Sequence, residues 1–441
     1  MSPTLMRNAG VAALVLASAS CAGAGFPPAA DANEAAASGV SEGAAAGTES
    51  SAAGAAQSAG FDQWLAGFRS DLRGEGVGDE IVAAMLDGLE PDPVVLERDA
   101  YQPEFVRPVW EYLQGAVSDQ RVTQGRAAQS RVASSLQEIE AEYGVDKDIL
   151  TAIWGLESAY GVIQGDFDIV RSLATLAWDG RRRNFAESQL KAVAQMIARG
   201  YATRDQLEGS WAGAMGQTQF IPTTYIERAV DFDGDGRRNI WESEADALAS
   251  AANLLAEAGW DRDEPVVEEV TLSEDFDYEA WSERLRLTVA EWAERGVTPA
   301  SGSFGSDVED LDARILLPAG GAGPAFIAYS NFDTLLRYNN STSYALGVSY
   351  LAKTLEGSGE LPGGWPEGDR PLGRDHARDL QAGLTALGYD TQGIDGVVGP
   401  NTRTALRAFQ QAKGLEPDGY AGAEAYEQVI GVPPAQEEAE D

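Results

Sequence analysis

Aromatic side chains begin abruptly at Phe61 and Trp64, and this boundary limits where a folded core can start. Between residues 31 and 60, 22 of 30 residues are Ala, Gly or Ser and none is aromatic. Such a segment cannot bury enough apolar area to offset the entropy lost when it is ordered. We therefore expect residues 25–60 to form a disordered tether and the folded part of the chain to begin at residue 61.

The first 24 residues have the pattern of a secretory signal peptide. One basic residue, Arg7, precedes a short apolar stretch from Val11 to Ala17, and small residues follow it. Ala22-Gly23-Ala24 fits ordinary signal cleavage, whereas Ser18 to Cys21 resembles a bacterial lipobox in which Ser18 replaces the usual Leu. The first alternative predicts a soluble exported protein. The second predicts membrane attachment through an acylated Cys21.

The composition excludes several classes of function. The 441 residues are enough for roughly two to four domains. Their net charge of -38, from 70 acidic and 32 basic side chains, repels nucleic acid. The single cysteine, Cys21, and the single histidine, His376, exclude a disulfide and the common zinc sites within one chain. Catalysis must then rest on carboxylates, hydroxyls, amides or an oxygen-bound metal, and no organic cofactor is expected.

The sequence predicts a helix over residues 146–161 that buries a carboxylate. Asp146 can cap this helix and Gly161 can end it. Apolar residues at helical spacing form one stripe, which consists of Ile149, Leu150, Ile153 and Trp154. Glu157 falls on the stripe, so its side chain points to the core, where desolvation raises a carboxyl pKa as a general acid requires. The alternative is a structural glutamate paired with an arginine or a helix N-terminus.

Two further segments carry groups suited to binding sugars. Residues 209–222 hold three glycines and end at Pro222, so the backbone can approach a ligand closely. This segment also offers neutral hydrogen-bonding groups on Ser210, Gln217 and Gln219. Residues 337–344, Arg-Tyr-Asn-Asn-Ser-Thr-Ser-Tyr, combine aromatic faces with amides. Taken singly, the first segment fits a simple turn and the second fits an ordinary helix start after a polar loop.

Together, these three segments resemble the lytic murein transglycosylases of the membrane-bound lytic transglycosylase B family over residues 61–356. The resemblance is carried by Gly155-Leu156-Glu157-Ser158-Ala159-Tyr160-Gly161, by Gly-Ser-x-Ala-Gly-Ala-Met-Gly-x-x-Gln-Phe from residue 209, and by Tyr338-Asn339. It implies a lysozyme-like catalytic domain in which Glu157 is the single catalytic acid and base. The residues expected to bind the sugars around it are Ser210, Gln219, Tyr338 and Asn339, with Tyr344 from the third segment. Where many members continue Tyr-Asn-Arg, this chain has Asn340.

The reaction implied by this resemblance cleaves peptidoglycan at the β-1,4 bond between N-acetylmuramic acid and N-acetylglucosamine, without water, and forms 1,6-anhydromuramic acid. A glycosidase ordinarily uses two carboxylates, but here the muramoyl acetamide and C6 hydroxyl of the substrate supply the nucleophiles. Asp166 and Asp168 are near enough in the chain that a lysozyme-like muramidase is the nearest enzymatic alternative. A catalytically silent peptidoglycan-binding protein is the alternative from a different class.

Residues 231–242 match the EF-hand calcium loop at every principal position. The expected ligands are Asp231, Asp233, Asp235, the carbonyl of Arg237, Asn239 and Glu242, with Gly236 at the turn. The loop departs from the pattern at its eighth position, Arg238, which is usually aliphatic, and no second such loop occurs. We therefore expect a structural calcium site, as in the resembled family, rather than a sensor. An acidic turn without metal is the alternative.

The C-terminal part predicts a separate small module. Residues 357–371 are rich in Gly and Pro and predict a linker. An Asp-Gly-x-x-Gly turn at Asp395 recurs 23 residues later at Asp418, and each turn precedes a helical run. Residues 372–432 therefore predict a three-helix module that resembles the peptidoglycan-binding domain 1 family, although a structural module without ligand explains the periodicity equally well. The acidic residues 433–441 are expected to form a solvated tail.

The predicted fold class is mainly α (α+β), with a lysozyme-like catalytic domain, an EF-hand-like calcium loop and a small three-helix peptidoglycan-binding domain. The expected location is the periplasm of a Gram-negative bacterium, with outer-membrane anchoring where Cys21 is acylated. Peptidoglycan glycan strands are the expected partner. The triple-basic run Arg181-Arg182-Arg183 either meets stem-peptide carboxylates or forms a solvated helix face.

Overall fold

The computed structural model describes residues 49–100 and 107–434. The predicted signal peptide, Cys21 and the last seven residues of the predicted tail, 435–441, lie outside the described residues. Within the described ranges, no helix has both the length and the apolar character that a membrane span requires.

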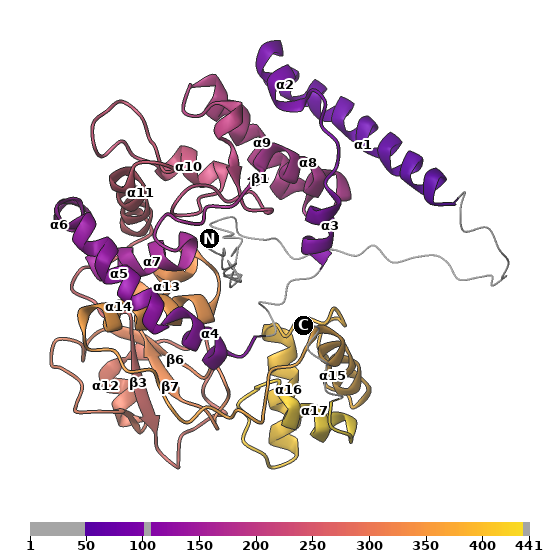
Figure 1. The fold of residues 1–441 in the computed structure, drawn as a ribbon. Helices are drawn as coiled ribbons and strands as arrows, with labels where there is room; N and C mark the ends of the chain where they lie inside the picture. The colour runs from indigo at the N-terminus through magenta and orange to yellow at the C-terminus, as the bar shows by residue number, and fades with distance from the viewer. Residues whose placement is uncertain (1–48, 101–106, 435–441) are drawn as a thin grey trace, which may run out of the picture.

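Helices form most of the chain before residue 260 and return after a sheet (Figure 1). The first group is α1 Glu49–Gly74, α2 Asp79–Leu86, α3 Pro93–Ala100, α4 Val109–Ala116, α5 Asp119–Arg131, α6 Ala133–Tyr143, α7 Lys147–Ser158, α8 Ile169–Asp179, α9 Arg183–Ala198, α10 Pro222–Arg228 and α11 Glu244–Glu257. A short 3-10 helix, Arg204–Gln206, and the two-stranded ribbon of β1 Phe167–Asp168 and β2 Glu208–Gly209 interrupt this group. The later helices of the same body are α13 Ser330–Tyr338 and α14 Thr342–Glu356.

Helix α7 lies inside the helical body, where it packs against α5, α6, α11 and α14. The predicted apolar stripe and the predicted cap are confirmed, since the stripe is buried and Asp146 accepts a 2.6 Å hydrogen bond from the backbone N–H of Asp148. The helix ends earlier than predicted, at Ser158 rather than Gly161. Ala159 and Tyr160 have already turned to left-handed φ values of 50° and 63°.

The early turn after α7 is explained by packing at Tyr160. A β-carbon at Gly155 would lie 2.6 Å from the Tyr160 ring, so only glycine lets this ring fold back against the helix. The Tyr160 hydroxyl then donates a 2.7 Å hydrogen bond to the backbone oxygen of Arg121 on α5. These two contacts of Tyr160 therefore fix the direction in which the chain leaves α7 after Ser158.

The N-terminal boundary differs from the prediction, because α1 begins at Glu49 and the tether was expected to extend to residue 60. Alanine has the highest helix propensity, and a helix propagates readily from a turn that packing has already fixed. Phe61, Leu65, Phe68 and Leu72 supply that packing, since all four are buried. The Ala-rich residues before Phe61 therefore continue this helix toward its N-terminus at Glu49.

A five-stranded antiparallel sheet lies between α11 and α13, a region that the sequence patterns indicated as mostly helical. Its strands are β3 Val267–Leu272, β4 Leu287–Thr288, β5 Val297–Pro299, β6 Asp312–Leu316 and β7 Ala325–Ala328, in the order β4-β6-β7-β3-β5, and α12 Val289–Glu294 follows β4. In register, Val267 pairs with Ala328 and Leu316 with Phe326. Every residue of β7 is buried, because alternate side chains enter the helical body and a second core around Trp292. A strand buried on both faces shows no alternation of polarity, so its pattern resembles that of a buried helix.

The predicted three-helix module is present, with α15 Arg374–Ala386, α16 Pro400–Ala412 and α17 Ala423–Ile430 around their own core. Its two Asp-Gly turns are held in the same way. Gln381 donates to Asp395 at 2.9 Å and accepts from the Gly396 N–H at 2.8 Å. Gln410 makes the equivalent bonds to Asp418 and Gly419, both at 2.8 Å. A glutamine from the preceding helix therefore fixes each turn.

The module is packed against α4 and the sheet, whereas the Gly- and Pro-rich residues 357–371 were expected to be a linker. Trp365 in this segment packs against Trp110 of α4 and Phe326 of β7, with ring centroids 5.8 and 6.2 Å apart. Tyr420 of the module is buried with Trp110. Figure 1 shows the module, in yellow, beside the sheet and α4. The connection is therefore a docked segment, because aromatic contacts hold it in place.

Candidate functional site

Glu157 is the buried carboxylate around which the site is arranged. Its side chain, near the C-terminus of α7, is 1% exposed. The hydroxyl of Tyr344, in the first turn of α14, donates a 2.7 Å hydrogen bond to Glu157 Oε1. Burial, followed by the negative charge of Glu157, raises the pKa of Tyr344 well above its usual value. Tyr344 therefore keeps its proton and acts as a donor to the carboxylate.

Tyr338 and Asn339 lie at the junction between α13 and α14. The Tyr338 ring stacks on Tyr344 with centroids 6.4 Å apart and planes 8° from parallel. Its hydroxyl donates a 2.6 Å bond to the backbone oxygen of Thr218, which ties this junction to the glycine-rich segment. Asn339 is buried, and its Nδ2 has no hydrogen-bond partner among the described residues. This amide is therefore available to an incoming acceptor, whereas Asn340 is exposed.

The glycine-rich segment, residues 209–222, forms a tight irregular turn. Ser210 is buried, and its hydroxyl accepts a 3.0 Å hydrogen bond from the Ala214 N–H, so this hydroxyl stabilises the turn. Gln219 is also buried and has a left-handed φ of 51°. Its amide donates to the backbone oxygens of Gly216 at 2.8 Å and Gln164 at 3.1 Å. In this structure both predicted sugar ligands thus hold the segment in shape, and their direct contact with a sugar stays a prediction.

Tyr112, on α4, is a site residue that the sequence analysis missed. Burial and then the charge of Glu157 raise the pKa of Tyr112 above its usual value. Its ring packs on α14, where a β-carbon at Gly347 would lie 2.8 Å from Tyr112 Cε1. The charge of Glu157 thus raises the pKa of three tyrosines, Tyr112, Tyr338 and Tyr344, and the last of these is hydrogen-bonded to the carboxylate. No local pattern marks Tyr112, because its role depends on contacts made far away in the sequence.

The two candidates for a second catalytic carboxylate have other surroundings. Asp168 caps α8 by accepting a 3.1 Å bond from the Arg171 N–H, and it pairs with Arg204 at 2.5 Å. Asp166 is exposed. The other buried carboxylates of the described residues also have structural partners: Asp99 pairs with Arg181 and Arg182, Asp148 with Lys147, and Asp246 accepts backbone N–H groups. Glu157 thus differs from them in lying beside tyrosine hydroxyls.

The acidic loop brings together a set of oxygen donors that suits a hard cation such as calcium. Carboxylate oxygens of Asp231, Asp233 and Asp246 lie within 4.8 Å of one another. Asp246 was not predicted as part of the site; it is buried in the first turn of α11, and burial is the main cause of its raised pKa. Gly236 has the left-handed φ, 90°, that the sharp turn of such a loop requires. The donor set therefore fits a bound divalent cation.

The other predicted calcium ligands lie outside this cluster. Asp235 accepts a 2.8 Å hydrogen bond from the N–H of Arg237. Asn239 accepts a 3.0 Å bond from the N–H of Glu242 and donates to its carboxylate at 3.5 Å. These local bonds hold the loop in a turn, and participation of the four residues in a metal site stays a prediction.

Gln217 connects the acidic loop to α7. Its side-chain amide donates a 3.2 Å bond to the backbone oxygen of Trp241 and accepts a 2.9 Å bond from Trp154 Nε1. Its backbone oxygen accepts a 2.6 Å bond from the Ser158 hydroxyl, next to Glu157. One buried residue therefore joins the loop to the helix that carries the carboxylate.

The triple-arginine run contacts protein groups. Arg181 and Arg182 pair with Asp99 at 2.6 and 3.1 Å, and the Arg182 guanidinium lies 5.8 Å over the ring of Trp211. Arg183 donates a 3.1 Å bond to the backbone oxygen of Ala177. The run thus helps to hold α3 against the segment before α9, and a contact with stem-peptide carboxylates stays a prediction.

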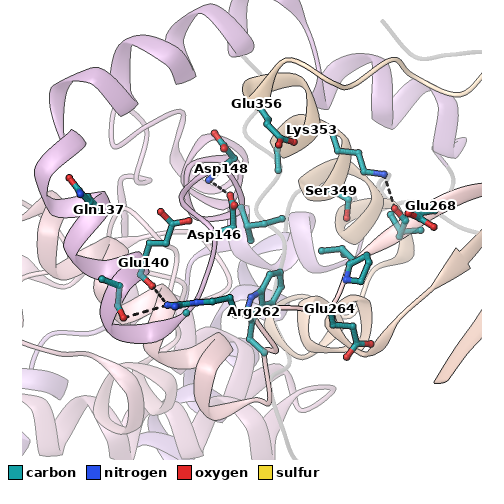
Figure 2. Close-up of a pocket in the computed structure, with 18 residues that line it drawn as sticks. Gln137, Glu140, Asp146, Asp148, Arg262, Glu264, Glu268, Ser349, Lys353 and Glu356 are labelled. Atoms are coloured by element: carbon teal, nitrogen blue, oxygen red, sulfur yellow. Dashed lines mark hydrogen bonds between the residues drawn. The ribbon is translucent and has the colours of Figure 1, made fainter. Parts of the chain in front are cut away.

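A cavity of about 620 Å³ lies at the opposite end of α7 from Glu157 (Figure 2). Its labelled side chains are mostly acidic, and its two cations bind backbone oxygens. Arg262 donates to Glu140 at 2.6 Å, and Lys353 donates to Val267 at 2.7 Å. Arg262 thus ties the loop before β3 to α6, and Lys353 ties α14 to β3, so the cavity has a structural arrangement distinct from that around Glu157.

Two family models match the chain. One, described as a transglycosylase SLT domain, matches residues 60–353, and the other, described as a putative peptidoglycan binding domain, matches residues 374–428. The membrane-bound lytic murein transglycosylase B of Escherichia coli (strain K12) is 31% identical over 219 residues. That match covers 48% of this chain and 58% of the relative, so the chain spans little more than half of that protein.

Solved structures give longer matches. The crystal structure of SltB3 from Pseudomonas aeruginosa in complex with NAG-anhNAM-pentapeptide is 45% identical, with a TM-score of 0.81 and coverage of 84% of this chain and 99% of that one. The Escherichia coli lytic transglycosylase Slt35 in complex with calcium is 27% identical, with a TM-score of 0.58 and coverage of 66% and 92%. These similarities confirm the predicted mainly helical fold class and both family resemblances.

Replacing Tyr344 by Phe should destabilise the catalytic domain by about 1–3 kcal/mol at neutral pH, because it removes a donor to a buried carboxylate. The measurement is the urea midpoint of unfolding. Tyr350→Phe on the same helix is the control, since the Tyr350 ring packs against Phe326 of the sheet rather than at Glu157. Equal midpoints for the two variants would mean that the bond to Glu157 contributes nothing to stability.

Proposed function

Because this chain belongs to the transglycosylase SLT domain family, we propose that it is a lytic transglycosylase that cleaves peptidoglycan between N-acetylmuramic acid and N-acetylglucosamine. The observation that carries this proposal is one buried carboxylate, Glu157, surrounded by tyrosines and bonded to Tyr344. The products would end in 1,6-anhydromuramic acid. A NAG-anhNAM-pentapeptide is the ligand bound to the Pseudomonas relative, which supports the same chemistry here.

In the proposed reaction Glu157 acts first as an acid and then as a base. It donates its proton to the glycosidic oxygen as that bond breaks, while the muramoyl acetamide oxygen assists at the anomeric carbon. The carboxylate then accepts the proton of the C6 hydroxyl, whose oxygen forms the new bond to the anomeric carbon. The muramoyl residue thereby closes its 1,6-anhydro ring, and Glu157 regains its proton. No second protein carboxylate is needed.

The residues around Glu157 would orient the sugar and limit access of water. The Tyr344 hydroxyl donates a 2.7 Å hydrogen bond to Glu157 Oε1. This bond restricts the positions from which the Glu157 carboxyl group can transfer a proton. Asn339 Nδ2, buried and unpartnered, suits an oxygen of the sugar or its acetamide. The hydrogen bonds of Ser210 and Gln219 suggest that they act mainly by shaping the segment beneath the substrate.

Hydrolysis by a lysozyme-like route has less support. A muramidase of this kind needs a second carboxylate or a water held by one. Asp168 instead bonds to Arg204 and to the N-terminus of α8, and Asp166 is exposed. The buried setting of Glu157 likewise favours an enzyme over a silent binding protein, because burying a carboxylate costs stability and only the enzyme would use the buried acid.

The C-terminal module would hold peptidoglycan, as its family resemblance implies, and the acidic loop would hold calcium. Asp231, Asp233 and Asp246 would provide carboxylate oxygens to the cation, with Asp235, Arg237, Asn239 and Glu242 completing the loop. Calcium would neutralise these charges and so stabilise the loop. The proposed location is the periplasm, reached by way of the signal peptide, with the mature protein either soluble or attached to the membrane through an acylated Cys21.

Glu157→Gln should lower the turnover of purified peptidoglycan by about a thousandfold, because the amide keeps the shape and cannot transfer the proton. Released muropeptides are measured by mass spectrometry, with melting curves to check folding. The matched control is Glu208→Gln, an exposed glutamate on β2, which should retain turnover. Wild-type turnover by Glu157→Gln would show that Glu157 is not the catalytic acid.

Chelation of calcium should lower the Tm by about 5 °C, since a ligand that binds only the native state stabilises it. Asp231→Ala should melt at the lower temperature with or without added calcium. Asp275→Ala, an exposed acid outside the loop, should keep the full response to calcium. Identical melting curves for the wild type in chelator and in calcium would show that the loop is an acidic turn without metal.

A further inference from the structure

Helix α4 connects the C-terminal module to the site through three successive residues. Trp110 is buried in a cluster with Ala319 and with Tyr420 of the module. Glu111 pairs with Arg370, in the segment before the module, at 2.6 Å. Tyr112 is the tyrosine whose pKa is raised in part by Glu157. One eight-residue helix therefore contacts the module, its connecting segment and the surroundings of Glu157.

Polar contacts fix the module against the sheet domain next to this junction. Arg407 of α16 donates a 2.6 Å bond to the backbone oxygen of Tyr278 and a further bond to that of Trp281. Its guanidinium also lies 4.8 Å over the Trp281 ring. Asp418, in the second Asp-Gly turn, accepts a 2.9 Å bond from the Gly321 N–H. Because Tyr420 lies within this turn, two residues after Asp418, these contacts help to determine where its ring meets Trp110.

On the side away from the module, α4 packs tightly against α14, so it cannot shift without moving residues near Glu157. It packs against α14, and the Tyr112 ring approaches α14 so closely at Gly347 that a β-carbon there would be 2.8 Å away. Gly347 is three residues after Tyr344, whose hydroxyl bonds to Glu157. A shift of α4 would therefore move Tyr112 relative to both Tyr344 and the carboxylate.

We propose that the C-terminal module positions the catalytic site: the seating of Tyr420 on Trp110 sets α4 and thereby holds Tyr112 beside Glu157. This inference rests on the proposed function and goes beyond it. The module then has a second role besides holding the wall, because it acts on the chemical step. Trp110 and Tyr420 are positioning residues, since they act through Tyr112. Loss of the junction should therefore slow turnover of a substrate too short to need wall binding.

The test uses the full chain and a soluble tetrasaccharide of alternating N-acetylglucosamine and N-acetylmuramic acid with stem peptides. Tyr420→Ala should lower kcat about tenfold, because a small misplacement of a positioned group is costly, with KM changed less than twofold. Tyr420→Phe keeps the ring on Trp110 and should retain the wild-type kcat. Ile394→Ala, at a module side chain that is 54% exposed, is the matched control and should also retain it.

A double-mutant cycle separates positioning from a general loss of folded enzyme. Tyr420→Ala introduced into Tyr112→Phe should have less than a twofold further effect, since no Tyr112 hydroxyl remains to be positioned. A further tenfold fall in that background would overturn the proposal, as would wild-type kcat in Tyr420→Ala alone.

Hydrogen exchange gives a readout that needs no turnover. Tyr420→Ala should speed exchange of the α4 amides, residues 109–116, whereas Tyr420→Phe should not. Unchanged exchange in Tyr420→Ala overturns the coupling whether or not the enzyme acts on peptidoglycan. Faster exchange together with a wild-type protein that releases no product would support the coupling of module and α4 while contradicting the proposed function.

Discussion

The burial of one carboxylate, that of Glu157, is the physical constraint on which this structure depends. Glu157 is 1% exposed, and burial of a charge is unfavourable unless donors are fixed around it. Its donor, Tyr344, is 187 residues away in the sequence, so bond formation requires the helical body to be packed first. α14 supplies that donor and also contacts the sheet, where the Tyr350 ring meets Phe326 edge-on and Lys353 donates to the backbone oxygen of Val267. The same helix thus joins the acid to the sheet domain.

The glycine-rich segment, residues 209–222, links the surroundings of Glu157 to other parts of the molecule by hydrogen bonds. Thr218 accepts from Tyr338 at 2.6 Å, which binds the segment to the α13–α14 junction. Gln217 bonds to Trp154, to Ser158 and to the backbone of the acidic loop. The carboxylate, the glycine-rich segment and the acidic loop are therefore parts of one hydrogen-bonded arrangement, and Gln217 is one of the buried residues that link the loop to α7.

Local patterns predicted the features whose causes lie within one element. The burial of Glu157 follows from its place on the stripe of α7, and the turns of the module follow from repeated Asp-Gly spacing. Tyr112, Asp246 and the docking of Tyr420 could not be predicted in this way, because each depends on a partner from another element. The buried strand β7 was missed for a different reason: apolar residues on both of its faces leave no alternation of polarity to detect.

In the proposed reaction, the substrate's own C6 hydroxyl completes the chemistry at Glu157, without a water nucleophile. The most direct test is digestion of purified peptidoglycan in water enriched in oxygen-18, followed by mass analysis of the released muropeptides at short times. We expect products that end in 1,6-anhydromuramic acid, one water lighter than hydrolysis products and free of the heavy isotope. Reducing-end muramic acid that carries oxygen-18 at the anomeric carbon as the main product would contradict it.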